Sequence, residues 1–179
     1  MGIPLPFNVK DPSLSAAEPA VGLPSLATER AIVALIFRAA RLSDDQKYLD
    51  WMGLFAEDGV YSAITYENIQ SSGLYLFKDV GRRALHVRAA FLMGMWQSPR
   101  GKTTHLVSNI EVQGGEDDDS ATAVSNFIMI RTGEMEHSKL HASGTYYDRF
   151  ERHGDGWLLK ERQVVVDTNV LPPEFTELL

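Results

Sequence analysis

His105 is the residue of this sequence best suited to moving a proton, because a neutral imidazole near pH 7 can accept or release one. It lies in THLVSNIEV, residues 104–112, where apolar and polar residues alternate as in a β-strand. The alternation places His105 and Asn109 on one face of the strand and Leu106 on the other, apolar face. Three roles are open to His105: hydrogen bonding in a subunit interface or on a sheet surface, which its polar face favours, general base in a pocket, or metal ligand.

Two other stretches contain residues that could bind a metal, but their spacing does not favour it. His137 and His141 would share one face of a strand roughly 13 Å apart, at about 3.3 Å per residue, which is too far for one ion. The acidic run GEDDDS, residues 115–120, lacks the alternating ligands and the final bidentate Glu of a calcium-binding loop. We predict no metal site in this chain and a solvated hairpin tip at GEDDDS.

The sequence contains no cysteine. This excludes disulfides, thiolate zinc sites, a cysteine nucleophile and iron–sulfur clusters of the Rieske or ferredoxin type, because each of them requires cysteine sulfur. If the chain works with such a cluster, the cluster must lie on another polypeptide.

Length and composition are those of a globular protein of one domain, with 179 residues, 44% hydrophobic and 23% charged. A formal net charge of -7 and no cluster of Lys and Arg argue against nucleic acid or an anionic membrane as the main partner. No apolar run approaches the roughly 20 residues that span a bilayer, and the first residues lack the basic and apolar regions of a signal peptide. We therefore expect a cytoplasmic protein.

The first 24 residues differ from the rest of the chain. They contain five prolines, at positions 4, 6, 12, 19 and 24, and no apolar period. This composition is typical of an extended segment. We predict an N-terminal arm over residues 1–24, suited to lying on a neighbouring subunit, and a single domain over residues 25–179.

Apolar residues with helical spacing predict helices in the first half of the domain. One helix is expected from about 25 to 41. A second begins at a capping box formed by Ser43 and Gln46, includes Phe55 on its apolar face, and ends at the Glu57–Gly59 turn.

The order of the remaining elements predicts the fold class. A short strand over 60–65, a loop over 66–80 and a third helix after Gly81 precede a change from helical to strand periodicity. Tight turns rich in Gly and acidic residues then join strands that must be antiparallel. These strands are expected at 103–113, 121–132, 137–150 and 157–167. The result is an α+β domain in which a strongly bent antiparallel sheet wraps around a helix.

Four stretches together carry a resemblance to a known family: YLDWMGLFAEDGVYSAI, THLVSNIEV, AVSNFIMIRT and GWLLKERQVVVD. The sequence resembles the small (beta) subunit of aromatic-ring-hydroxylating dioxygenases, whose fold is the nuclear-transport-factor-2-like (NTF2-like) cone, over most of residues 25–170. The tail NVLPPEFTELL departs from the short apolar strand with which the family ends.

The resemblance implies a supporting role in an enzyme. In this family the large (alpha) subunit carries a Rieske 2Fe-2S cluster and a mononuclear iron that activates O2, and the small subunits form a trimer beneath three large ones. This chain would then hold no catalytic residue and no cofactor of its own, and would stabilise a hetero-hexamer. Arg100, Lys102 and His105 are the candidate interface residues.

The same fold also suggests a rival function. It hosts free-standing dehydratases and isomerases in which an acid and a histidine inside the cone move protons next to a carbonyl. In this chain Asp50, Tyr61 and His105 would be the catalytic residues. Fold alone does not decide between the two functions.

Overall fold

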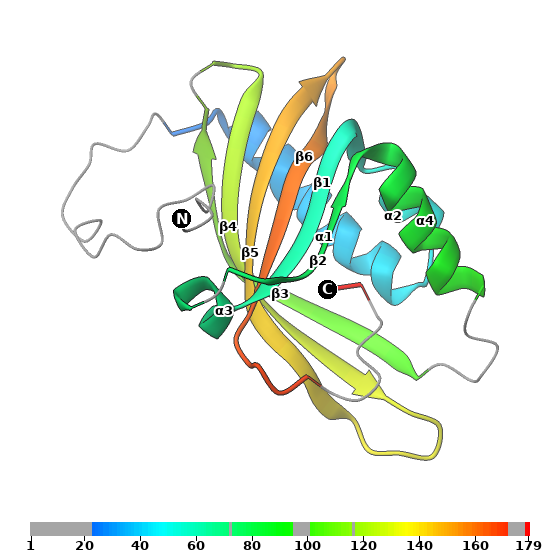
Figure 1. The fold of residues 1–179 in the computed structure, drawn as a ribbon. Coiled ribbons are helices and arrows are strands. Elements are labelled where there is room, and N and C mark those ends of the chain that lie inside the picture. The colour runs from blue at the N-terminus through cyan, green and yellow to red at the C-terminus, as the bar shows by residue number, and fades with distance from the viewer. Residues whose placement is uncertain (1–22, 72, 95–100, 116, 172–177) are drawn as a thin grey trace.

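A long helix lies across the concave face of a curved sheet (Figure 1). The computed structural model describes residues 23–71, 73–94, 101–115, 117–171 and 178–179. Helix α1 (Leu26–Asp44) begins at Ser25, whose hydroxyl accepts a hydrogen bond from the Thr28 main-chain N–H. Its apolar stripe, Ile32, Ile36 and Ala39, is fully buried against the sheet, as the helical spacing predicted.

Six strands form one sheet in the order β2-β1-β6-β5-β4-β3. Every neighbouring pair is antiparallel except β1 and β6, so the sheet is mixed. β2 and β3 are its two edge strands. Among the described residues they do not pair with each other, so the curved sheet forms an open cone and not a closed barrel. The strands are β1 (Phe55–Thr65), β2 (Tyr75–Val80), β3 (Lys102–Gly114), β4 (Ser120–Thr132), β5 (Lys139–His153) and β6 (Gly156–Val166).

Three shorter helices complete the described fold: α2 (Tyr48–Met52), α3 (Tyr66–Gln70) and α4 (Gly81–Gly94). Helix α4 packs on α2 and β1 and buries Leu85, Ala89 and Leu92. None of the helices among the described residues is long and apolar enough to cross a membrane.

The predicted α+β class, the first and third helices and the four long strands are confirmed. The predicted loop over 66–80 is wrong, because it contains α3 and the edge strand β2. β2 is an edge strand of only six residues, most of them half-buried. Its sequence therefore lacks the clear alternation of apolar and polar residues that predicts a strand. Trp96, the last predicted residue of the third helix face, and residues 1–22 of the predicted arm lie outside the described residues.

The predicted capping box is also wrong. Helix α1 continues through Ser43, whose hydroxyl is buried and donates to the main-chain oxygen of Leu178 at 3.3 Å. Gln46 instead has a left-handed backbone, with φ of 58°. The second helix ends earlier than predicted, because Phe55 opens β1 and the Glu57–Gly59 turn becomes a bulge where β1 loses register with β6.

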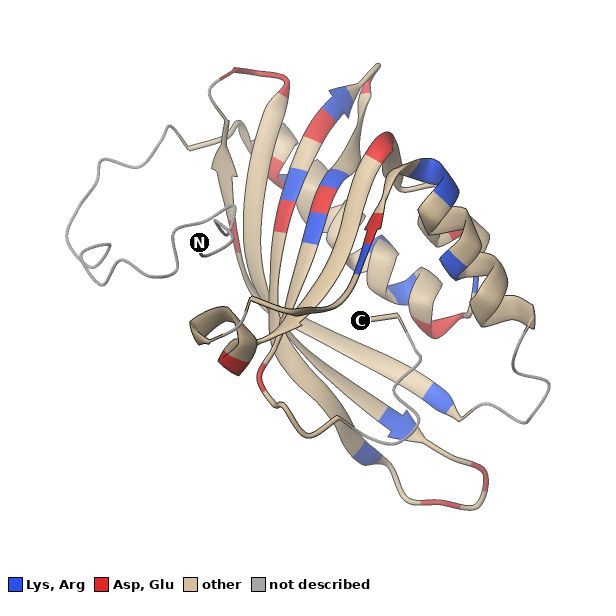
Figure 2. Cartoon of the chain, in the orientation of Figure 1, with Lys and Arg blue, Asp and Glu red and all other residues tan. Residues whose placement is uncertain are grey.

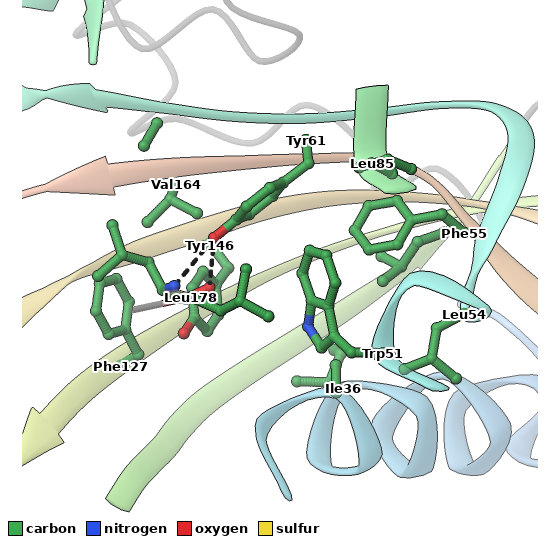
Figure 3. Packing of buried hydrophobic residues seen from close by; sticks show 14 of the residues in the cluster. Ile36, Trp51, Leu54, Phe55, Tyr61, Leu85, Phe127, Tyr146, Val164 and Leu178 are labelled. Carbon is green, nitrogen blue, oxygen red and sulfur yellow. Dashed lines mark hydrogen bonds between the residues drawn. The ribbon is translucent and has the colours of Figure 1, made fainter. Parts of the chain in front are cut away.

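Aromatic rings form much of the buried core (Figure 3). The Trp51 ring centroid lies 4.8 Å from those of both Phe55 and Tyr61. Phe127 and Tyr146 stack face to face, with centroids 4.4 Å apart and planes within 8°. Leu178 and Leu179 join the same cluster and are almost fully buried, so two residues from the far end of the chain help to fill the cone.

Candidate functional site

Asp44 and His105 form a pair inside the cone. Nδ1 of His105 lies 2.6 Å from Oδ1 of Asp44, and the main-chain N–H of His105 donates to Oδ2 at 2.9 Å. The imidazole is 1% exposed and the carboxylate 18% exposed. The last residue of α1 and the first part of β3 are thus held together by two hydrogen bonds that fix the orientation of the ring.

The predicted face of His105 is wrong. Leu106 is 52% exposed, whereas His105 points into the cone. The cause is a bulge in β3 between Ser108 and Glu111, where Asn109 adopts a left-handed backbone with φ of 51°. The extra residue shifts the alternation by one, so that His105 before it and Ile110 after it face the same side.

The carboxyl of Asp44 is held in its ionised form. Burial acts to raise its pKa, but hydrogen bonds from the ring and main chain of His105 outweigh burial, and the pKa lies below its ordinary value. An ionised carboxylate only accepts hydrogen bonds, so Nδ1 of His105 is the donor in this pair.

The other ring nitrogen of His105 is unsatisfied. Nε2 is buried and meets no hydrogen-bond partner among the described residues. Buried polar atoms of this kind are rare, since each loses its bond to water without a replacement. Within the described residues, Ser125 on the inward face of β4 also has a buried hydroxyl without a partner, but His105 is the titratable group left in this state inside the cone.

Tyr61 also points into the cone, but its hydroxyl is engaged. It donates to the main-chain oxygen of Leu179 at 3.2 Å and accepts from the Leu179 N–H at 3.0 Å, the two dashed lines of Figure 3. Complete burial raises the pKa of Tyr61 to about 12, so the phenol stays neutral.

Asp50, the acid of the rival active site, is not near these residues. It is exposed on α2, whereas Tyr61 and His105 are inside the cone. The structure therefore brings together His105 and Asp44, not His105 and Asp50. Sequence reasoning missed Asp44 because a capping box at Ser43 places Asp44 in the first turn of a helix, where acids are common. At the last turn of α1, where it lies, a carboxylate is unfavourable without another partner.

Of the three predicted interface residues, the structure places Lys102 on the surface and His105 in the interior. Lys102 is exposed at the start of β3, and Arg100 lies outside the described residues. His105 makes its side-chain contact within the chain, through Asp44.

A metal site has no support within the described ranges. They contain no group of three or more His, Asp or Glu side chains arranged to hold an ion. His105 in particular meets a single carboxylate.

A curved open sheet wrapped around an N-terminal helix defines the class of NTF2-like proteins. An NTF2-like protein with a cystatin-like fold from Novosphingobium aromaticivorans superposes with a TM-score of 0.61 at 21% identity, over 81% of this chain and 85% of that chain. The predicted fold class is confirmed.

The family follows from the sequence match. The family model described as "Ring hydroxylating beta subunit" matches residues 38–173, and the chain belongs to this family. Two solved structures have the same fold. One, from N. aromaticivorans and described as the beta subunit of an aromatic-ring-hydroxylating dioxygenase, has a TM-score of 0.75 at 22% identity, over 84% of this chain and 95% of that chain. The other is naphthalene 1,2-dioxygenase with indole bound in the active site, with a TM-score of 0.68 at 19% identity over 84% of each chain.

Proposed function

We propose that this chain is a structural subunit of a multicomponent aromatic-ring-hydroxylating dioxygenase and that it carries no catalytic centre of its own. The observation that supports this most strongly is the family match over residues 38–173. The large subunit would carry the Rieske 2Fe-2S cluster and the mononuclear iron, and would insert both atoms of O2 into an aromatic ring with electrons from NAD(P)H through a reductase. We place the complex in the cytoplasm, where NAD(P)H is available.

An apolar surface on the sheet supports self-assembly. Leu106 and Ile128 are cross-strand partners and are 52% and 44% exposed. The next pair along the sheet is Ile130 and Leu140, the latter 68% exposed. Because Phe127 and Met129 point into the core, these four residues lie on the opposite, outer face of the sheet. We call them the outer apolar patch.

The outer apolar patch lies in an uncharged region of the sheet. Residues 121–130 and 140–147 contain no Lys, Arg, Asp or Glu. Figure 2 shows charged residues toward one end of β5, β6 and β1 and an uncharged stretch through the middle of β3–β5. Depletion of charge around exposed apolar residues is typical of the centre of a protein–protein interface. We propose that this patch joins the copies of the chain in a homotrimer.

Two further segments belong to the proposed assembly. Lys102 and Arg100, at the start of β3 and just before it, are proposed to contact an acidic surface of the large subunit. Residues 1–24 are proposed to lie as an arm on a neighbouring subunit, outside the single domain of residues 25–179.

Co-purification with the large subunit tests the proposal. A tagged copy of this chain, co-expressed with a large subunit encoded beside it, should retain that subunit together with its iron, measured by visible absorption and metal analysis. Lys102→Glu should weaken retention, most strongly at low salt, whereas Lys78→Glu, at an exposed lysine of β2 on the opposite edge of the sheet, should not. Failure of the wild-type chain to retain the large subunit would refute the assembly role.

A further inference from the structure

Assembly does not account for the unsatisfied Nε2 of His105. Exposed histidines lose nothing when left unpaired, but this ring is 1% exposed and points into the cone. Its partner Asp44 is ordered by two hydrogen bonds to the same residue, at 2.6 and 2.9 Å. Nε2 of His105 is therefore a fixed hydrogen-bonding atom in the interior that has no partner among the described residues.

The chemistry of this position follows from the tautomer. Asp44 is an acceptor at both oxygens, since Oδ2 takes the main-chain N–H and Oδ1 faces Nδ1. In the neutral tautomer that is compatible with this contact, Nδ1 carries the proton and Nε2 holds a lone pair. A group that satisfies Nε2 must be a donor, such as a hydroxyl.

The end of the chain contacts the residue that precedes Asp44. Ser43, the residue before Asp44, donates to the main-chain oxygen of Leu178. The side chains of Leu178 and Leu179 are 2% and 3% exposed. They share the core cluster with Tyr61, Phe127 and Tyr146, so aromatic rings line the region that the two leucines fill.

We propose that the cone contains a latent binding site for a single-ring aromatic compound with a hydroxyl group. The hydroxyl donates to Nε2 of His105, and the ring replaces the side chains of Leu178 and Leu179 among the aromatic residues. Removal of leucine side chains from a core can leave a cavity of about 150 Å³, which is enough for benzene. In the intact chain the leucines compete with the ligand, because Tyr61 holds Leu179 by two hydrogen bonds.

The test compares phenol with toluene, which has a methyl group in place of the hydroxyl. The probed protein is the full chain with Leu178→Ala and Leu179→Ala, and binding is measured by calorimetry and by tryptophan fluorescence, to which Trp51, packed on Tyr61, contributes. We expect phenol to bind about tenfold more tightly than toluene, although toluene is the more apolar of the two, because only phenol forms the hydrogen bond to His105. Weaker or equal binding of phenol would overturn the proposal.

Two variants in the same background show whether His105 is the acceptor. His105→Phe should abolish the preference for phenol. Asp44→Asn should reverse it, because the new amide can accept the main-chain N–H and donate to Nδ1, which moves the ring proton to Nε2. That variant should favour benzaldehyde, an acceptor, over phenol. Retention of the phenol preference in either variant would overturn the proposal.

A measurement on the unaltered chain covers the case in which the variants do not fold. The ¹⁵N chemical shifts of the imidazole report which nitrogen carries the proton. We expect Nδ1 of His105 to be protonated and Nε2 to be free, and we expect millimolar phenol to shift the Nε2 resonance. A protonated Nε2, or no response to phenol, would contradict the proposal, and neither result bears on binding of the large subunit.

Discussion

Asp148 on β5 and Arg162 on β6 form a bidentate ion pair inside the cone. Nε and one terminal nitrogen of Arg162 donate to the two carboxylate oxygens at 2.8 and 2.6 Å, and both side chains are at most 2% exposed. The guanidinium also lies over the ring of Tyr146, 4.4 Å from its centroid. Burial acts to lower the pKa of Arg162, but the Asp148 carboxylate outweighs it and the pKa is raised, so the guanidinium stays charged.

Breaking this buried pair should destabilise the chain severely. Asp148→Asn should lower the free energy of unfolding by about 3–5 kcal/mol, because it leaves the Arg162 charge buried without a counter-charge. Urea unfolding followed by tryptophan fluorescence measures the effect. Lys160→Met is the matched control on the same strand, since Lys160 pairs with Asp58 at the surface, and it should have a much smaller effect. Equal effects of the two substitutions would contradict the assigned role of the buried pair.

Tyr61 should make the chain sensitive to alkaline pH. Burial raises its pKa in the folded state to about 12 from an ordinary value of 10. The neutral phenol is therefore the form that folding favours, and this contribution is complete below pH 10 and is lost as the pH rises toward 12. The rise of the Tyr61 pKa from 10 to about 12 corresponds to about 3 kcal/mol in the free energy of unfolding.

The control for the alkaline effect is Tyr61→Phe. At neutral pH it should cost about 1–3 kcal/mol, because the Leu179 N–H loses its acceptor. Between pH 10 and 12 the variant should lose less stability than the wild type, although the buried Tyr146, whose pKa is also raised by burial, still contributes. Parallel pH profiles of the two proteins would contradict the assignment.

Gly144 should not tolerate a side chain. A Cβ at this position of β5 would lie 2.1 Å from the main-chain oxygen of Val165 and 2.9 Å from the Phe127 ring. Gly144→Ala must therefore displace β6 or the stacked aromatic pair, and we expect a loss of at least about 1–3 kcal/mol in urea unfolding. Gly94→Ala, where a Cβ meets no atom within 4 Å among the described residues, should be neutral or stabilising.

The bulge at Asn109 should depend on backbone conformation more than on the side chain. Asn109→Gly and Asn109→Val both remove the hydrogen bond from Asn109 to Asn126, at 3.0 Å. Only valine, which is β-branched, strongly disfavours φ of 51°. Valine should therefore cost roughly 1–2 kcal/mol more than glycine in thermal unfolding, and equal stabilities would show that the bulge is not maintained by this residue.

The sequence predicted the long helices and strands but not the contact between Asp44 and His105. Helix α1 and strands β3–β6 are long and periodic, so apolar spacing predicted them. The side on which His105 lies was not predictable from alternation, because one residue with positive φ, Asn109, shifts the phase in the middle of the strand. The role of Asp44 was not predictable because its partner His105 is 61 residues away in the sequence. A plausible local motif, the capping box of Ser43 and Gln46, also accounted for the residues around it.

Native mass spectrometry of the purified chain, alone and with the large subunit, tests the central claim most directly. We predict a species of three times the 19.9 kDa of one chain, and with the large subunit a complex that contains equal numbers of both chains together with iron. Ile128→Asp in the outer apolar patch should dissociate the trimer, whereas Leu49→Asp, at a residue 43% exposed on α2, should leave it intact. A wild-type chain that stays monomeric and binds no large subunit would contradict the account.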